Sequence, residues 1–245
     1  MNNKIEELSR ILKESNNIVF FGGAGCSCES GIPDFRSSNG LFNEKLNTKF
    51  TPEQLVSHSF YIRYPKEFFN FYKSKLIYPT AKPNGTHFTL AKLEEMGKLK
   101  AVITQNIDGL HQMAGSKNVF ELHGSVHRNY CTQCHAFYDS NFVLESKEIP
   151  TCTKCGGTVK PDVVLYEEGL DDDVITASID AISKADTLII GGTSLVVYPA
   201  AGLINYFRGK NLILINKSST SADSKANLVI NDSIGKVLTT AINNI

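Results

Sequence analysis

Short, mostly apolar runs recur along the chain. The first is Ile18–Phe21, which ends in Gly22 and Gly23. Such runs are typical of strands that are buried on both faces of a sheet, because no alternate position has to face water. Four similar runs follow, at residues 101–104, 118–122, 187–190 and 211–216. We therefore expect a buried sheet built from these strands.

Apolar residues at helical spacing fill several of the gaps between these runs. Residues 4–15 place Ile5, Leu8, Ile11 and Leu12 on one stripe. Similar helical patterns occur at residues 86–97, 173–184 and 199–208. Strands that alternate with helices predict a parallel sheet covered by helices on both faces, so the expected fold class is α/β.

The longest apolar window, residues 187–204, is interrupted by Gly191, Gly192 and Pro199. We interpret it as a strand, a loop and the start of a helix, because a membrane span needs about 20 consecutive apolar residues. The polar N-terminus, MNNKIEELSR, has no secretory signal. The expected location is therefore the cytoplasm, without membrane contact.

Two stretches break the alternation of strands and helices. Residues 31–80 are rich in aromatic residues and prolines, and residues 124–160 contain four cysteines. We interpret both as insertions that pack into a smaller second module. The remaining residues, 1–30, 81–123 and 161–245, are expected to form the large domain.

Composition narrows the range of possible functions. The chain has 245 residues, and 42% of them are hydrophobic, which is enough to bury a sizeable core. Its 25 basic residues balance its 25 acidic residues. Broad nucleic-acid surfaces need an excess of Lys and Arg, so no nucleic-acid partner is expected.

Four of the six cysteines form two Cys-x-x-Cys pairs, Cys131/Cys134 and Cys152/Cys155. Two such pairs separated by a loop of this length are typical of a zinc site with four thiolate ligands. Four protein ligands leave no position for water or substrate, so the expected zinc is structural. A redox-active dithiol pair is the alternative.

The run Ile18–Phe21 leads into a glycine-rich segment, residues 22–31. Glycines after a parallel strand let the backbone approach a pyrophosphate, and the next helix N-terminus offers free N–H groups. A tight turn without a ligand is the competing interpretation. Cys28 stands where the dinucleotide fingerprint has its third glycine, and no strand ending in an acidic residue follows about 20 residues later. We therefore expect dinucleotide binding without standard hydride transfer.

Polar residues follow two of the predicted strands. Gln105, Asn106 and Asp108 come after the run at 101–104, and His123 comes after the next run. Ligands of open α/β sheets bind beyond the carboxyl ends of the strands, so these side chains are expected to share one pocket. Asn and Asp also cap helices, which is the alternative. The ordinary pKa of histidine suits His123 to act as a general base.

Six motifs together resemble the sirtuin family in its compact bacterial form. In chain order they are GAGCSCESGIPDFRS, TQNIDGLH, ELHGS, the paired Cys-x-x-Cys, KPDVVLYEE and GTSLVVYPA, and they cover about residues 18–217. The resemblance implies a Rossmann-like parallel sheet with helices on both faces, plus a small domain made of a zinc ribbon and a helical module. It also implies an NAD-dependent protein lysine deacylase, which transfers the acyl group to ADP-ribose. The products would be nicotinamide, O-acyl-ADP-ribose and the deacylated lysine.

The resemblance also implies roles for individual residues. His123 would be the general base, Asn106 would assist catalysis, and Phe35 would shield the reacting sugar carbon. The implied NAD contacts are Ala24, Gly25, Cys28, Phe35, Arg36, Gln105, Ile107, Asp108, His123, Thr193, Ser194, Asn216, Lys217 and Ile234.

The acylated lysine would reach the site on an extended peptide. Val164 and Tyr166 on one side and Val196 on the other would pair with this peptide as an added strand. Desuccinylating relatives carry Tyr-x-x-Arg in the small domain, whereas this chain has Tyr72-x-x-Lys75. Lysine lacks the bidentate fork of arginine, so we predict mainly deacetylation with weak desuccinylation. A plain pair on a helix surface is the alternative.

The chain departs from the family pattern at three residues. Cys26 and Cys28 replace the usual Ile and Thr of the glycine loop, which suggests either two small buried residues or sensitivity to oxidation. Glu167 replaces a Gly at the rim of the peptide channel and leads us to expect a preference for basic neighbours in the substrate. Acylated proteins are the expected partners of a monomeric enzyme. The alternatives are an NAD-dependent mono-ADP-ribosyltransferase and an NAD-sensing or zinc-ribbon module without catalysis.

Overall fold

A computed structural model of the chain describes residues 2–37, 40–41 and 49–245. Part of the predicted helical module, residues 38–39 and 42–48, therefore lies outside the described residues. Among the residues that are described, no helix combines the length and the apolar character needed to cross a bilayer.

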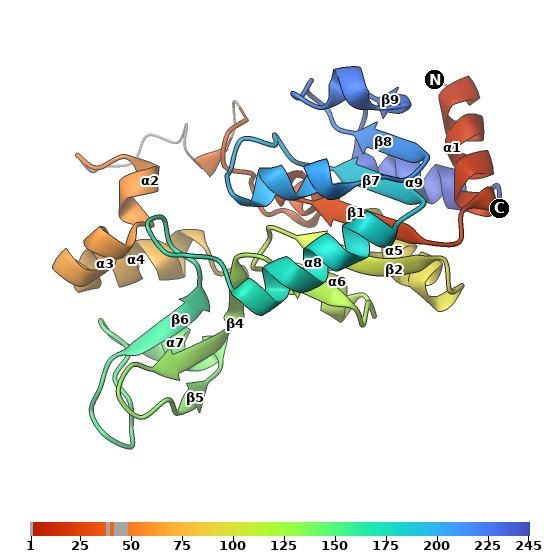
Figure 1. Ribbon diagram of the computed structural model, residues 1–245. Helices are drawn as coiled ribbons and strands as arrows, with labels where there is room; N and C mark the ends of the chain where they lie inside the picture. Colours follow the sequence, from red (N-terminus) through yellow and green to blue (C-terminus); the bar gives the residue numbers. More distant parts are fainter. Residues whose placement is uncertain (1, 38–39, 42–48) are drawn as a thin grey trace.

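The large domain is built on a parallel sheet of six strands in the order β3-β2-β1-β7-β8-β9 (Figure 1). Numbered by their succession along the chain, these strands follow the order 3-2-1-4-5-6 of a Rossmann-like fold. The order reverses between β1 and β7, which places the topological switch point at the carboxyl ends of these two strands. The strands are β1 (Ile18–Gly22), β2 (Leu99–Thr104), β3 (Val119–Glu121), β7 (Thr187–Gly191), β8 (Asn211–Ile215) and β9 (Leu228–Ile230).

Helices cover both faces of this sheet, because successive residues of a strand point to opposite faces and both sets are apolar. In β1, Ile18 and Phe20 face one core, whereas Val19 and Phe21 face the other. The first core packs against α1 (Asn2–Glu14), α5 (Gly85–Glu95) and α9 (Ile234–Ile242). The second packs against α8 (Asp172–Lys184) and the 3₁₀ helix η4 (Ala200–Tyr206).

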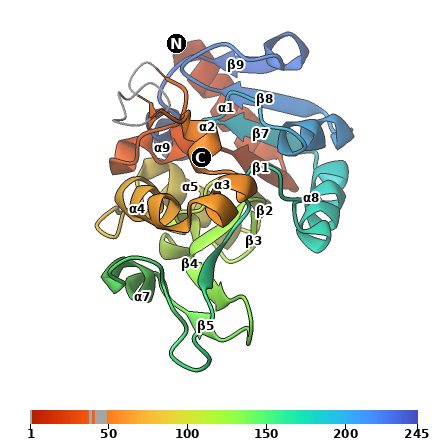
Figure 2. The same cartoon turned by 90° about the vertical axis from the view of Figure 1, so that its left-hand side faces the viewer.

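The small module lies at one end of the large domain (Figures 1 and 2). Its zinc module, residues 124–163, contains a three-stranded antiparallel sheet in the order β5-β4-β6 and the helix α7. Its helical module contains α2–α4, whose aromatic residues share one core with the zinc module. The bounds are β4 (Gly124–Cys131), β5 (Phe137–Tyr138), β6 (Val159–Val163), α2 (Pro52–Leu55), α3 (His58–Arg63), α4 (Pro65–Lys75) and α7 (Ser140–Glu145).

The sheet and its covering helices match the apolar pattern of the sequence, with three differences. β9 and α9 were not predicted, although Ile234, Val237, Leu238 and Ala241 have helical spacing and are all buried. The segment predicted as a helix at 199–208 is the 3₁₀ helix η4. Finally, β6 runs in the small sheet to Val163, which is three residues past the predicted end of the ribbon at 160.

One lysine ties the two parts of the small module together. The ammonium of Lys73 on α4 donates to the carbonyl and hydroxyl oxygens of Ser146, at 2.6 Å each, and to the carbonyl oxygen of Glu148 at 2.9 Å. These acceptors follow the C-terminus of α7, where carbonyl groups lack helical partners. The Lys73 contacts therefore fix the helical module against the zinc module.

Candidate active site

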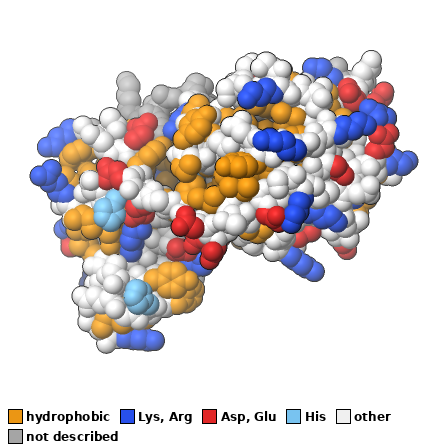
Figure 3. Space-filling model, in the orientation of Figure 1, with side chains coloured by type: hydrophobic (Ala, Val, Ile, Leu, Met, Phe, Trp, Pro, Cys, Tyr) orange, Lys and Arg blue, Asp and Glu red, His pale blue; other side chains and the backbone are white. Residues whose placement is uncertain are grey.

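A cavity of about 740 Å³ opens at the carboxyl ends of the central strands, between the large domain and the small module. Figure 3 shows hydrophobic side chains gathered on this face of the molecule, between its two parts. The cavity brings together every residue for which the sequence predicted an NAD contact, and also Asn106, which was predicted to assist catalysis. The predicted NAD contacts are Ala24, Gly25, Cys28, Phe35, Arg36, Gln105, Ile107, Asp108, His123, Thr193, Ser194, Asn216, Lys217 and Ile234.

Three of the predicted substrate residues, Val164, Tyr166 and Lys75, also line this cavity, but two do not. Tyr72 is fully buried in the aromatic core and stacks on Phe68 at 5.7 Å between ring centroids. Burial raises the pKa of its phenol, so the hydroxyl keeps its proton. Tyr72 thus packs inside the helical module and does not face the cavity. Val196 is exposed outside the lining.

The glycine loop forms one wall of the cavity by close contact between two backbones. After β1 the chain turns through the 3₁₀ helices η1 (Ala24–Cys26) and η2 (Cys28–Ser30). The N–H of Gly25 donates to the carbonyl oxygen of Gly192 at 2.8 Å. A Cβ on Gly25 would lie 2.7 Å from the Cα of Gly192, so only glycine fits at this position.

A network of polar side chains joins the glycine loop to the segment after β2. Ser27 donates from Oγ to Oδ2 of Asp108 at 2.6 Å, and Asn106 donates from Nδ2 to Oγ of Ser27 at 3.0 Å. The other carboxylate oxygen of Asp108 accepts from the N–H of Leu110 at 3.0 Å, at the start of α6 (Leu110–Met113). Asp108 therefore accepts from the first N–H of α6, although Gly109 is the N-cap, and it also takes part in the pocket.

Hydrogen bonding determines which nitrogen of His123 can act as a base. Its Nδ1 lies 2.9 Å from the carbonyl oxygen of Gln105. A carbonyl oxygen only accepts, so Nδ1 carries the hydrogen and Nε2 keeps a lone pair. Burial lowers the pKa of His123 below its ordinary value, although the Gln105 carbonyl opposes this effect. The imidazole is therefore neutral at pH 7 and ready to accept a proton at Nε2.

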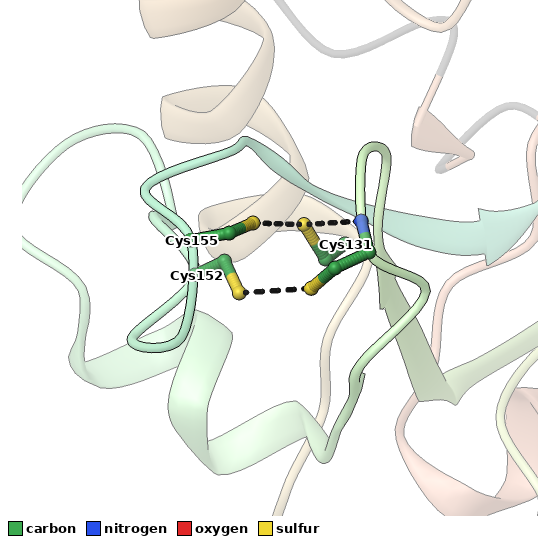
Figure 4. A group of neighbouring side chains, drawn as sticks. Cys131, Cys152 and Cys155 are labelled. Atoms are coloured by element: carbon green, nitrogen blue, oxygen red, sulfur yellow. Dashed lines mark hydrogen bonds between the residues drawn. The ribbon is translucent and has the colours of Figure 1, made fainter.

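The four cysteines of the zinc module form one compact group (Figure 4). All four sulfur atoms lie within 4.8 Å of one another. The Sγ–Sγ distances are 3.4 Å for Cys131–Cys155 and 3.6 Å for Cys134–Cys152. Thiolates placed about 2.3 Å from a tetrahedral zinc ion are separated by about 3.8 Å, so this group fits zinc. N–H groups of Gln133 and Cys134 point to the sulfur of Cys131, which is typical of such a thiolate turn.

The two remaining cysteines lie in an environment that suppresses thiolate formation. Cys26 is completely buried, and burial raises the pKa of its thiol to about 12. Cys28 is half-buried, and burial followed by the charge of Asp34 raises its pKa as well. Thiols react as thiolates, so this environment favours two small packed residues over the predicted sensitivity to oxidation.

The rim of the cavity contains the segment that was predicted to bind peptide. Tyr166 donates its N–H to Val56 and accepts from the N–H of His58, both at 3.0 Å, and its hydroxyl accepts from Arg36 at 3.2 Å. Glu167 adopts φ 78°, in the left-handed region that favours glycine. Its carboxylate accepts from the N–H and hydroxyl of Ser59 at 2.8 and 2.6 Å. Because the Glu167 carboxylate is bonded to Ser59, we do not expect it to attract basic residues of the substrate as the sequence suggested.

Several lining residues were missed by the sequence reasoning. Asp232 and Ser233 follow the end of β9 by two and three residues and border the cavity next to Ile234. The same rule about carboxyl ends of parallel strands would have found them, had the short strand β9 been predicted. Leu76 and Tyr78 line the cavity from the segment after α4 and carry no sequence signal of their own.

Comparisons with known proteins agree with this geometry. The chain is 81% identical over 97% of its length to an NAD-dependent protein deacetylase of Clostridium perfringens, of which it covers 98%. It is 64% identical over 98% of its length to a protein of the same name from Clostridium acetobutylicum, of which it also covers 98%.

Solved structures extend the likeness to the fold. A Sir2 structure with a deacetylated p53 peptide and 3'-O-acetyl-ADP-ribose is 38% identical, with a TM-score of 0.90 and 98% of each chain covered. A Sir2 structure with a p53 peptide and NAD+ has the same identity and coverage and a TM-score of 0.86. The profile of the Sir2 family matches residues 23–199. The chain belongs to the Sir2 family.

Proposed function

We propose that the chain is an NAD-dependent protein lysine deacetylase that transfers the acetyl group to ADP-ribose. One water molecule would be consumed to release the lysine, and the products would be nicotinamide, O-acetyl-ADP-ribose and free lysine. The observation that carries this proposal is His123, a neutral histidine with a free Nε2 that lines the cavity beside the glycine loop. The names of the closely similar clostridial proteins support it.

NAD would occupy the part of the cavity that the large domain lines. Bound there, it would supply a sugar carbon that can lose nicotinamide and an ADP-ribose that can accept the acyl group. The backbone around Gly25 would hold the pyrophosphate, because this loop follows β1 directly and lines the cavity. Asp108 and the backbone of Ile107 would hold the carboxamide, and Asn216 would meet the adenine ribose.

His123 and Phe35 would perform the remaining tasks at the reacting end. Nε2 of His123 would take a proton from a ribose hydroxyl, since Nδ1 is committed to the carbonyl of Gln105. The imidazolium formed would be stabilised by that same carbonyl. Phe35 would exclude water from the reacting carbon, which protects a developing positive charge from hydrolysis. The zinc ion would hold the fold of the zinc module and would take no part in these steps.

The acylated peptide would enter at the rim as an added strand. Val164–Tyr166 would lie on one side of the peptide and Val196 on the other. The N–H and the carbonyl of Tyr166 already bond to Val56 and His58, so the peptide would pair with other backbone groups of this segment. The Sir2 structures with bound p53 peptide support a peptide site of this kind.

Acetyl groups would be preferred over succinyl groups. Lys75 lines the cavity and could meet an acidic acyl group as a point charge. Tyr72 is buried, so the second member of the expected pair does not reach the acyl chain. We therefore expect succinyl removal to be slow. Mono-ADP-ribosyl transfer, the other candidate activity, would need no proton acceptor placed like His123.

Mass spectrometry of peptide products tests the proposal. The protein, NAD and an acetyl-lysine peptide should give free lysine peptide and O-acetyl-ADP-ribose in equal amounts, with succinyl and longer acyl peptides turned over more slowly. His123→Ala should lower kcat by about 100-fold or more, because a positioned general base contributes about that much. Turnover that is unchanged in His123→Ala, or ADP-ribose attached to protein in place of deacetylation, would contradict the proposal.

We also propose that the enzyme works as a monomer in the cytoplasm on proteins and not on nucleic acid. The balance of 25 basic and 25 acidic residues supports the part of this proposal that concerns nucleic acid. Light scattering coupled to size-exclusion chromatography should give one species near 27.0 kDa. A stable dimer at micromolar concentration would overturn the monomer.

A further inference from the structure

A histidine outside the predicted site touches the turn that follows β2. His127 lies on β4, and its Nε2 lies 3.0 Å from the carbonyl oxygen of Asp108. The preceding residue, Val126, donates its N–H to the carbonyl oxygen of Ile107, also at 3.0 Å. Both carbonyl groups of this turn are therefore held by consecutive residues of β4.

The imidazole ring also fits the shape of the turn. Gly109 has φ 71°, and a Cβ at this position would lie 2.7 Å from Cδ2 of His127. The ring therefore rests directly on the backbone of Gly109. The opposite side of the turn is held by Ser27, through its 2.6 Å bond to the Asp108 carboxylate. The turn is clamped between the glycine loop and His127.

The other ring nitrogen points toward the zinc module. Nδ1 of His127 lies 3.5 Å from the hydroxyl oxygen of Ser140, the first residue of α7. The carbonyl of Asp108 only accepts, so Nε2 carries a hydrogen and donates it, and Nδ1 is the ring nitrogen that faces Ser140. His127 also shares the strand β4 with Cys131, a member of the thiolate group. Its ring thus lies between the zinc module and the turn that contains Asp108.

We propose that His127 is a positioning residue that sets the nicotinamide end of the NAD site. It holds the carbonyl of Asp108 and the backbone of Gly109, so Asp108 and Ile107 present their groups to the carboxamide in a fixed geometry. This inference rests on the proposed function, in which Ile107 and Asp108 bind that carboxamide. It assigns no contact between His127 and NAD itself.

Binding of two ligands to the intact protein separates this role from a merely structural one. His127→Phe keeps a ring over Gly109 but removes the donor to Asp108. Isothermal calorimetry should show NAD affinity reduced by about three- to tenfold, the range expected for one lost hydrogen bond, while ADP-ribose affinity is unchanged. ADP-ribose lacks nicotinamide and therefore does not report on the turn. His127→Gln, whose side-chain amide can donate to the same carbonyl, should restore NAD affinity.

Controls make each failure identifiable. His135→Asn, at an exposed histidine of the zinc module with φ 57°, should change neither affinity. Equal losses of NAD and ADP-ribose affinity in His127→Phe, or no loss at all, would overturn the inference. Asp108→Asn tests the proposed function separately. If Asp108→Asn leaves NAD affinity intact, the assignment of Asp108 to the nicotinamide carboxamide fails. If Asp108→Asn weakens NAD binding but His127→Phe does not, only the role of His127 is refuted.

Discussion

The cofactor loop, which is the glycine loop at residues 22–31, and the zinc module hold their cysteines in different surroundings. In the zinc module Tyr138 donates to the sulfur of Cys152 at 3.1 Å and lowers the pKa of that thiol, which favours the thiolate. In the cofactor loop burial raises the pKa of Cys26 to about 12, which favours the neutral thiol. The same residue type is therefore a metal ligand in one region and a packing residue in the other. The convergence of four sulfur atoms, which Cys26 and Cys28 lack, distinguishes the metal ligands from the packing residues.

Metal removal should have the largest effect, because the zinc module has little apolar core of its own without the metal. Its own apolar cluster has three fully buried residues, Cys131, Cys152 and Val159, and two of them belong to the thiolate group. Metal binding in small zinc domains is worth on the order of 10 kcal/mol of folding free energy. Chelation should therefore unfold the zinc module and abolish deacetylation, as followed by zinc release and near-UV circular dichroism.

Restoration of activity by added zinc is the control for this experiment. ADP-ribose binding should survive better than catalysis, since the glycine loop lies in the large domain. Full deacetylase activity in protein shown to be free of zinc would contradict the contrast between the two regions.

Adding one methyl group to the cofactor loop should give the next largest effect. In Gly25→Ala the new Cβ would meet the Cα of Gly192 at 2.7 Å, and both atoms belong to tightly packed backbone. We expect the free energy of unfolding to fall by about 1–3 kcal/mol and NAD affinity to fall with it. Urea titration and calorimetry provide the two measurements.

Gly169→Ala is the matched control for Gly25→Ala. A Cβ at Gly169 meets no atom within 4 Å, so its effect should stay within about 0.5 kcal/mol. If both substitutions behaved alike, close backbone packing would not be what shapes the cofactor loop.

Acid should weaken the large domain through a buried histidine pair under the cofactor loop. His87 and His111 lie edge to face at 4.7 Å between ring centroids, and burial lowers their pKa values to about 4 and about 3. The unfolded chain binds these protons near pH 6.5, so it takes them up first as the pH falls. Stability from this pair is complete above pH 6.5 and should decline as the pH falls toward 4.

His111→Phe keeps the ring and removes one titration. The free energy of unfolding, measured by urea at pH 7 and pH 5, should then fall less between these pH values than in the unaltered protein. The reason is that the variant takes up about one proton fewer on unfolding. An unchanged pH dependence would mean that other groups cause the acid sensitivity.

The smallest effect on activity is expected from substitution of Cys28, in contrast to the four cysteines of the zinc module. Cys28→Ser should alter kcat/KM by no more than about twofold, because its thiol makes only weak contacts with Ala24 and Asp34. Peroxide should inactivate the variant and the unaltered protein at the same rate. A variant that resists peroxide would restore the idea of a redox-sensitive loop.

Much of the site could be predicted because its signals are local in the sequence. The two Cys-x-x-Cys pairs carry their own spacing, and Gln105–Asp108 and His123 follow apolar strands whose carboxyl ends meet at one edge. Tyr72 was misplaced because neither its neighbours nor its spacing shows which face of α4 packs inward. That choice depends on Phe68 and on the core shared with the zinc module.

Long-range contacts account for the rest of what was missed. β9 has three residues, too few for a pattern, and owes its place to pairing with β8. Glu167 takes a conformation that favours glycine, and its carboxylate caps α3, more than a hundred residues earlier in the chain. His127 has no motif around it, since its partners Asp108 and Ser140 come from two different segments.

The order of strands in the large sheet has a consequence for biosynthesis. β1 leaves the ribosome long before one of its neighbours, β7, which begins at Thr187. Until that residue has emerged, one edge of a fully apolar strand stays open to unwanted pairing. Pairing of β1 with β2 covers the opposite edge and docking of α1 covers one face, so neither closes the edge that awaits β7. Slow translation between β2 and β7 should therefore lower the yield of soluble protein more than slow translation after β7.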